Sequence, residues 1–252
     1  MKKTVIAAAL LCAGGLPLAA TADNHEEDET YIYATYMYCD TTRQAEADKI
    51  FEEVHKPILE DAKKNGDITG WGWLVHHTGG KWRRIRYHTA GSVEGVLAGL
   101  EAIGEKMDEA TGDDDAFGQI CNAHDDYIWR SVTGSSGGPL EGDRGKVSMS
   151  TYHRCKMSKE DRADELVETM FAKHYDAHVG PGKLRSWGWS EHIVGGEYRR
   201  LSTMSADDWP TLLKMRASIF ESFGEEDSAL AEAFAEICPS HADYMWEIAH
   251  EG

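Results

Sequence analysis

Hydrophobic and polar residues recur with two different periods along this chain, and these periods predict its elements. Over 41–65 apolar residues return every three or four positions, which predicts a helix with one apolar face, capped by Thr41 or Thr42. Pro57 is expected to kink this helix. A second helical pattern follows Ser92, a residue type that favours the N-cap position. Segments rich in Tyr, Thr and Trp predict four strands, at 31–39, 71–77, 81–88 and about 124–130.

The chain repeats this order of elements, and parts of the sequence itself, about 116 residues later. The repeated positions include Trp-Gly-Trp and Gly-Gly-x-x-Arg-Arg segments and two cysteines in each copy. In the second copy the pattern predicts strands at 147–155, 187–194, 197–204 and 241–248. It also predicts three helices: one that begins at a capping box formed by Ser158 and Asp161, one at 209–223 and one at 229–237. Solenoid repeats are shorter than this, so the period indicates a duplicated domain.

The sequence divides into two copies and three connecting or leading segments. We assign the copies to 31–130 and 146–252, joined by a glycine-rich linker at 131–145. Residues 1–22 have the two lysines, apolar run and small-residue cleavage site of a signal peptide, and 23–30 is an acidic leader. The chain is therefore expected to be exported to the periplasm or secreted.

The charge of the chain restricts its partners. The formal net charge of −18 argues against nucleic acid or an anionic membrane as a partner, because both would be repelled. No segment after the leader is apolar and long enough for a membrane span. These patterns leave a small-molecule ligand as the expected partner.

Four cysteines remain once Cys12 is lost with the signal peptide: Cys39, Cys121, Cys155 and Cys238. Their even number and an oxidising compartment favour disulfides, for which the sequence alone allows three pairings. The alternative is metal binding, because Cys121 and Cys238 are each followed three residues later by a histidine, and two Cys2His sites would accept zinc or copper.

The strand, helix, strand, strand, helix, strand order is that of the ferredoxin-like split βαβ unit. Two such units in tandem, with Gly-Gly hairpins, resemble the dimeric α+β barrel superfamily. This resemblance implies an α+β fold of two ferredoxin-like units packed as one intramolecular barrel. The superfamily includes cofactor-free monooxygenases and haem-binding proteins related to chlorite dismutase. In a ferredoxin-like sheet the first and last strands are neighbours, which implies the pairs Cys39–Cys121 and Cys155–Cys238.

Several side chains that both copies keep are candidates for a site. Trp71 and Trp73 share one strand face, as do Trp187 and Trp189, and they either pack beneath the helices or form an aromatic wall for a flat ligand. His76 and His192 lie on the opposite face and are candidate catalytic bases or ligand contacts.

Arginine is the second kept feature. Each copy has two consecutive arginines on a predicted strand, and successive strand residues point to opposite faces. One of each pair, Arg84 or Arg200, is therefore expected to face inward, where it needs Asp126, Asp243 or an anionic ligand as its partner.

The copies differ most on the first helix. His174 and His178 lie four residues apart on one helix face, where the first copy has Ile58 and Ala62. Such histidines can bind ligand, metal or haem iron, and the resemblance places haem between helices and sheet. Apart from haem or a metal at these histidines, we expect no cofactor.

We therefore expect an exported small-molecule-binding or accessory protein with aromatic, His- and Arg-bearing pockets, whose ligand is flat and apolar or anionic. The alternative is an oxygenase-like enzyme of the dimeric α+β barrel type, cofactor-free or haem-assisted.

Overall fold

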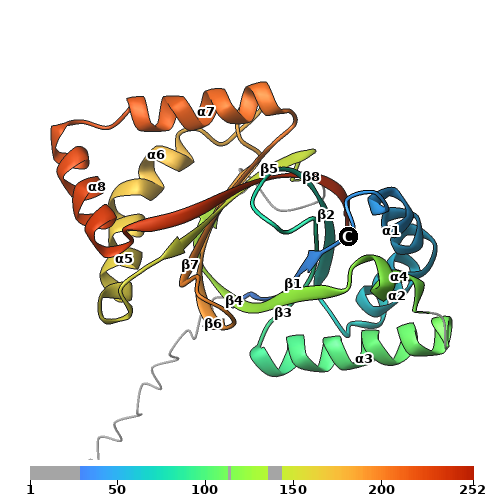
Figure 1. Cartoon of the computed structure of the whole chain (residues 1–252). Helices are drawn as coiled ribbons and strands as arrows, with labels where there is room; N and C mark the ends of the chain where they lie inside the picture. The colour runs from blue at the N-terminus through green and yellow to red at the C-terminus, as the bar shows by residue number, and fades with distance from the viewer. Residues whose placement is uncertain (1–28, 113–114, 136–143) are drawn as a thin grey trace, which may run out of the picture.

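Eight antiparallel strands close into one barrel, and the helices lie on its outside (Figure 1). The computed structural model describes residues 29–112, 115–135 and 144–252. The predicted signal peptide, nearly all of the acidic leader and residues 136–143 of the predicted linker lie outside the described residues. The strands are β1 (Tyr31–Tyr38), β2 (Gly70–Gly79), β3 (Arg84–Ala90), β4 (Ala123–Ser135), β5 (Val147–Arg154), β6 (Ser186–Val194), β7 (Arg200–Ala206) and β8 (Ser240–Glu251).

Each copy contributes four adjacent strands, and the two sets are in the same order. The order around the barrel is β1-β3-β2-β8-β5-β7-β6-β4. Two seams join the copies, β2 with β8 and β4 with β6, and both contain register shifts. The strand β4 is longer than expected, because Ser131 to Ser135 pair with β6 and so belong to the barrel rather than to a linker.

The helices form two groups on opposite sides of the barrel (Figure 1). The first copy supplies α1 (Gln44–Ile50), α2 (Lys56–Asn65), α3 (Val93–Thr111) and α4 (Ala116–Ile120), and the second supplies α5 (Glu160–Leu166), α6 (Ala172–Asp176), α7 (Trp209–Glu221) and α8 (Glu225–Ile237). A membrane-spanning helix is not found among the described residues.

A π-helical turn interrupts the first long helix of each copy, at Phe51–His55 and Val167–Phe171. Pro57 follows the first of these turns, but Lys173 stands at the matching position after the second. Proline is therefore not required for the interruption, which belongs to the shared packing of this helix on the sheet.

The helix caps only partly match the sequence pattern. The Ser92 hydroxyl accepts a hydrogen bond from Gly95 N and caps α3 as expected. The caps expected at Thr41 or Thr42 and at Ser158 are wrong, because α1 begins at Gln44 and α5 at Glu160 without a side-chain cap. The competing local interaction is visible for Thr42, whose N–H and hydroxyl both bind Asp40 in a turn before the helix.

The two disulfides are Cys39–Cys121 and Cys155–Cys238, which confirms the predicted pairing. Each joins the end of a copy's first strand to the start of its last strand. Each closes a loop of more than 80 residues and is expected to stabilise the fold by about 2–4 kcal/mol. Their sulfur atoms are therefore not available as thiolate ligands for a metal.

Candidate functional site

Successive side chains of β2 and β6 point to opposite faces of the sheet. The tryptophans and histidines that both copies share therefore lie on opposite faces. Trp71 and Trp73 face the helices of the first copy, and the Phe51 ring stacks on Trp73 at 4.2 Å between centroids. Trp187 and Trp189 occupy the corresponding places in the second copy. Most of this aromatic surface is thus packed beneath the helices.

The kept arginines face the helices, and their partners differ from those expected. Arg84 and Arg200 are each 2% exposed. Their partners are the helix residues Asp48 and Asp164, through two contacts of 2.6 Å in the first copy and of 2.6 and 2.7 Å in the second.

The expectation of Asp126 or Asp243 was wrong because β1 separates β3 from β4 and β5 separates β7 from β8, so these aspartates are a strand too far away. The helix aspartates reach the arginines directly. Each helix aspartate also accepts a hydrogen bond from a kept indole, Trp73 Nε1 at 3.0 Å or Trp189 Nε1 at 2.7 Å. In both copies, the ion pair between the arginine and the helix aspartate therefore connects the helix to the sheet.

The histidines kept by both copies face the barrel interior. His76 lies edge-on to the Trp246 ring, and His192 lies edge-on to the Trp129 ring. The neighbouring arginines hold them, since Arg83 Nη1 lies 3.0 Å from His76 Nδ1 and Arg199 Nη1 lies 2.8 Å from His192 Nδ1. Burial lowers the pKa of both imidazoles.

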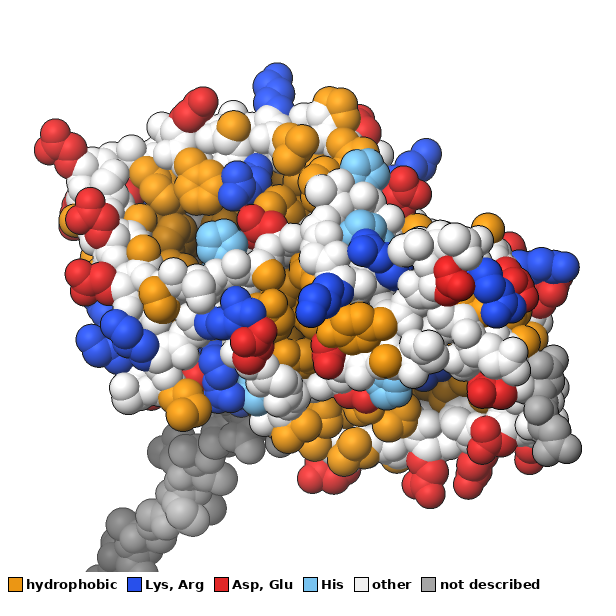
Figure 2. Space-filling view, viewed as in Figure 1, with side chains coloured by type: hydrophobic (Ala, Val, Ile, Leu, Met, Phe, Trp, Pro, Cys, Tyr) orange, Lys and Arg blue, Asp and Glu red, His pale blue; other side chains and the backbone are white. Residues whose placement is uncertain are grey.

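A cavity of about 470 Å³ lies between the sheet and the helices of the second copy. We call it the helix–sheet pocket. Seven aromatic residues line it: Phe171, Tyr175, Trp187, Trp189, Phe220, Phe223 and Phe234. In Figure 2 hydrophobic side chains gather in a hollow beneath α7, with a histidine at its margin. The volume and lining suit a ligand of two or three fused rings.

Substitutions between the copies explain why the pocket is open in the second. Val167 stands where the first copy has Phe51, whose ring covers Trp73. Ser202 stands where the first copy has Arg86, whose Nη1 reaches Met107 Sδ at 3.1 Å across the same space. Two large side chains that fill the first copy are therefore small in the second.

The height of the covering helix also differs between the copies. Gly99 of α3 lets that helix approach β3 and the residues before β2, since a Cβ there would lie 2.6 Å from Ile68 Cγ2 and 3.4 Å from His88 Cδ2. The matching residue of α7 is Met215, which is partly buried against the core of the second copy. A methionine at this contact keeps α7 farther from the sheet than glycine would.

Two nitrogen-bearing side chains give the helix–sheet pocket its polar character. His153 is 9% exposed, and its Nε2 lies 3.3 Å from Ser202 Oγ. Arg216 on α7 lies with its guanidinium carbon 5.1 Å from the centre of the Phe220 ring. Within the described part of the chain, no carboxylate lies within ion-pair distance of Arg216. The pocket thus combines an aromatic interior with one arginine that forms no ion pair in the described chain. Glu232 also lines the pocket, beyond ion-pair distance of Arg216.

Burial lowers the pKa of His153 to about 4. The unfolded chain binds a proton at His153 near pH 6.5 and the folded chain does not, so stability falls as the pH falls from about 6.5 to about 4. Between pH 6.5 and 4.5 the unfolding free energy of the wild type falls as the pH is lowered. We expect His153→Gln to reduce the slope of this fall by about 1 kcal/mol per pH unit. Urea unfolding at three pH values measures this. An unchanged slope in the variant would contradict a neutral, buried His153.

The two helical histidines singled out from the sequence lie beside the helix–sheet pocket and do not line it. His174 Nδ1 lies 2.7 Å from Ser222 Oγ, and its Nε2 lies 3.2 Å from Asp227 Oδ2. His178 Nδ1 lies 2.7 Å from the carbonyl oxygen of His174. These contacts tie α6 to the turn between α7 and α8. His174 Nε2 is buried and makes no hydrogen bond in the described chain, although Asp227 is near. Because neither histidine lines the pocket, this arrangement does not fit an axial haem ligand, and we derive no step through haem.

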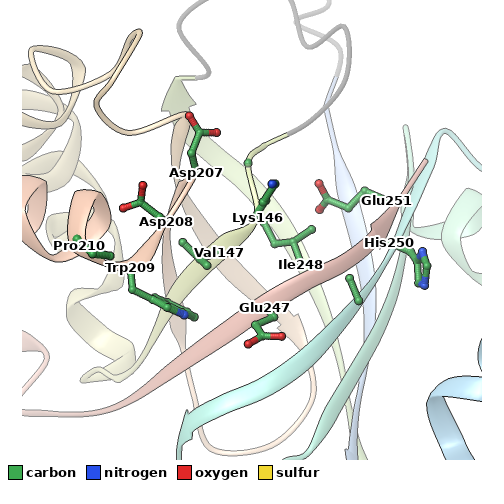
Figure 3. A pocket seen from close by; sticks show the side chains of 12 residues that line it. Lys146, Val147, Asp207, Asp208, Trp209, Pro210, Glu247, Ile248, His250 and Glu251 are labelled. Atoms are coloured by element: carbon green, nitrogen blue, oxygen red, sulfur yellow. The ribbon is translucent and has the colours of Figure 1, made fainter. Parts of the chain in front are cut away.

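Figure 3 shows a second hollow, of about 730 Å³, where β5 and β8 meet the start of α7. Four carboxylates line it, and three of them already have partners. Asp207 lies 2.9 Å from Arg185, Asp208 caps α7 through Thr211 N, and Glu251 pairs with Arg144. Nothing in this hollow points to a ligand as clearly as Arg216 does. The described residues also contain no group of three or more His, Cys, Asp or Glu arranged for a metal.

Comparison with known proteins identifies the fold. No family model matches the sequence, and no curated protein matches it. Among solved structures, an anthrone oxidase-like protein is similar over 90% of this chain and 94% of its own, with a TM-score of 0.58 and 14% identity. A protein from Fusobacterium nucleatum described as a monooxygenase is similar over 88% and 93%, with a TM-score of 0.57 and 8% identity. These neighbours are of the dimeric α+β barrel type, and such low identities establish the fold alone.

Proposed function

We propose that this protein binds a flat aromatic anion in the helix–sheet pocket. The observation that carries the proposal is Arg216, a cation without an acidic partner in the described chain, beside an aromatic cavity in a protein of net charge −18. A carboxylate or sulfonate on the ligand would supply the missing partner through charge-assisted hydrogen bonds.

The ring system of the ligand would be held by apolar contact. Trp187, Phe223 and Phe234 present aromatic surface to the cavity, and offset or edge-on contact with such rings adds to the gain from burial. His153 remains neutral at pH 7, so it supplies a hydrogen bond to a phenol or carbonyl group without adding charge.

Binding is better supported than catalysis. The oxygenase-like alternative rests on the fold shared with the neighbours and on His153, the one deeply buried imidazole that lines the pocket. An imidazole whose pKa is about 4 is a weak general base at neutral pH. His153 is therefore better suited to orienting a ligand than to removing a proton from it.

We further infer that the working protein is exported and that each copy is a ferredoxin-like unit. The two disulfides support export, because such bonds persist in oxidising compartments. The matching strand orders of the two copies support the ferredoxin-like assignment.

The charge requirement is tested with anilinonaphthalene sulfonate and its uncharged counterpart, phenylnaphthylamine. The two probes share their rings, so the ratio of their affinities isolates the contribution of the sulfonate. We expect Arg216→Leu, which installs the Leu100 of the first copy, to weaken the sulfonate about tenfold and to leave the uncharged probe unchanged, as expected for one charge-assisted contact. Fluorescence titration at constant salt measures both.

The control variant is Lys106→Leu on α3, which makes the same change of net charge on the corresponding helix of the first copy. It should leave both affinities unchanged. Equal affinities of the sulfonate for the wild type and Arg216→Leu would refute the proposed role of Arg216.

A further inference from the structure

Another cavity, of about 720 Å³, lies inside the barrel. It differs from both the helix–sheet pocket and the hollow of Figure 3. We call it the lumen cavity. One end of the barrel is filled by rings that pack together: Tyr36, Trp82, Tyr127, Trp129, Tyr152, Tyr198, Tyr244 and Trp246. The cavity occupies the other end, and Tyr36, Tyr152 and Trp129 form its floor. Trp129 Nε1 donates a hydrogen bond to Tyr36 Oη at 3.1 Å.

The walls of the lumen cavity differ sharply between the copies. The first copy presents Ile32, Ala34 and Leu74. At the three matching positions the second copy presents serines, namely Ser148, Ser150 and Ser190. These serines are 2%, 3% and 7% exposed. One side of the cavity is therefore hydrocarbon, and the facing side is a row of buried hydroxyl groups.

The duplication shows that packing does not require these hydroxyls. The same strand positions of the first copy carry apolar side chains in the same barrel, so a core of this shape accepts Ile, Ala and Leu there. Buried hydroxyl groups destabilise a core unless they are hydrogen-bonded. Their retention on one wall is accounted for by a ligand that satisfies them.

Two buried indole N–H groups of the barrel also lack hydrogen-bond partners in the described chain. Trp246 pairs with Ser148 across β5 and β8, and its indole N–H is buried with no hydrogen-bond partner in the described chain. The matching indole, Trp129, has its partner in Tyr36. Trp246 packs among the rings at the filled end of the barrel and does not line the lumen cavity. Trp71 does line it, and its buried indole N–H also has no hydrogen-bond partner in the described chain.

Two of the three charged residues that line the lumen cavity, Arg144 and Glu251, pair with each other. Arg144 Nε donates to Glu251 Oε1 at 2.9 Å, and Arg144 Nη2 donates to Tyr87 Oη at 3.0 Å. The remaining charged residue of the lining is Lys63, whose side chain is exposed. The serine wall itself carries no charge and offers hydrogen bonds rather than an ion pair.

We propose that the lumen cavity is a second binding site, for an uncharged amphiphile with hydrogen-bonding oxygens along one edge and a hydrocarbon face opposite. A cyclic alcohol, ketone or ester has this chemistry. The oxygens contact Ser148, Ser150 and Ser190, and the hydrocarbon face contacts Ile32 and Leu74. This site lies on the other side of the sheet from the helix–sheet pocket, and the two cavities share only Trp187 and Gly188 of β6 in their linings.

The test uses prodan, an uncharged naphthalene ketone whose fluorescence reports the polarity around it. Prodan is titrated into the wild type, into Ser148→Ala/Ser190→Ala, and into Val167→Phe, which fills the helix–sheet pocket. We expect the serine variant to bind prodan about tenfold more weakly, as expected for two lost neutral hydrogen bonds, and Val167→Phe to bind it as the wild type does. The alanine changes remove atoms and introduce no clash, and circular dichroism checks the fold.

A second variant, Ser148→Ile/Ser190→Leu, installs the residues of the first copy and should abolish binding, because it removes the hydroxyls and part of the volume. Absence of binding to the wild type overturns the proposal, as does full affinity in both serine variants. Loss of prodan binding in Val167→Phe would place the probe in the helix–sheet pocket and also overturn it. The result for the sulfonate probe at Arg216 is independent of all three outcomes.

Discussion

Replacing Val167 with phenylalanine should lower the affinity for anilinonaphthalene sulfonate by about 100-fold, which corresponds to about 2.7 kcal/mol of binding free energy. Val167 lines the helix–sheet pocket and is 4% exposed. The first copy shows what phenylalanine does at this position, because the Phe51 ring stacks on Trp73 at 4.2 Å. A ring at 167 should cover Trp189 in the same way and occupy the volume that the ligand needs.

The reciprocal variant, Phe51→Val, is the matched control. It removes a buried ring from the first copy and should lower stability by about 1–3 kcal/mol, with no effect on affinity for the probe. Val167→Ile should give an intermediate affinity. If Val167→Phe folds and binds the probe within twofold of the wild type, the helix–sheet pocket is not the site.

The second large effect is expected on stability. Asp48→Ala should lower the free energy of unfolding by about 3 kcal/mol, because it leaves the Arg84 guanidinium buried with only neutral partners, Gln44 and the Arg83 carbonyl oxygen. We place the loss at the lower end of the range for broken buried ion pairs, since the Asp48 side chain is 36% exposed.

The second copy provides an internal comparison for this variant. Asp164→Ala should lower the unfolding free energy less than Asp48→Ala does, because Glu160 lies 3.1 Å from Arg200 and remains as a partner. Asp61→Ala, which breaks an exposed ion pair with Lys106, should change it by less than about 1 kcal/mol. Urea unfolding followed by circular dichroism ranks the three variants. A loss for Asp48→Ala no larger than that for Asp61→Ala would contradict the proposed buried pair.

The duplication made the barrel and its disulfides predictable from the sequence. Residues kept at an offset of 116 or 117 fix which strands correspond, and the cysteines at strand ends then pair within each copy. The arginine partners were missed, although Asp48 and Asp164 are also kept by both copies. The expectation considered the last strand of each copy, whereas the arginines face the helices.

The helix–sheet pocket was beyond the reach of sequence patterns for a physical reason. Its opening depends on Gly99 in one copy and Met215 in the other, which set the height of a helix, and on Val167 and Ser202, which leave space. None of these four residue types suggests a ligand by itself. Differences between the copies did direct attention to the second copy. At two positions that line the pocket, the second copy has His153 and Arg216 where the first copy has Met37 and Leu100. His174 and His178, which lie beside the pocket, are a further difference.

The most direct test of the central claim is a crystal structure of the protein with anilinonaphthalene sulfonate bound. We predict one probe per chain, with its rings between α7, α8 and β6 and its sulfonate within ion-pair distance of Arg216. Probe density in the first copy, or density in the second copy with the sulfonate directed away from Arg216, would contradict the account.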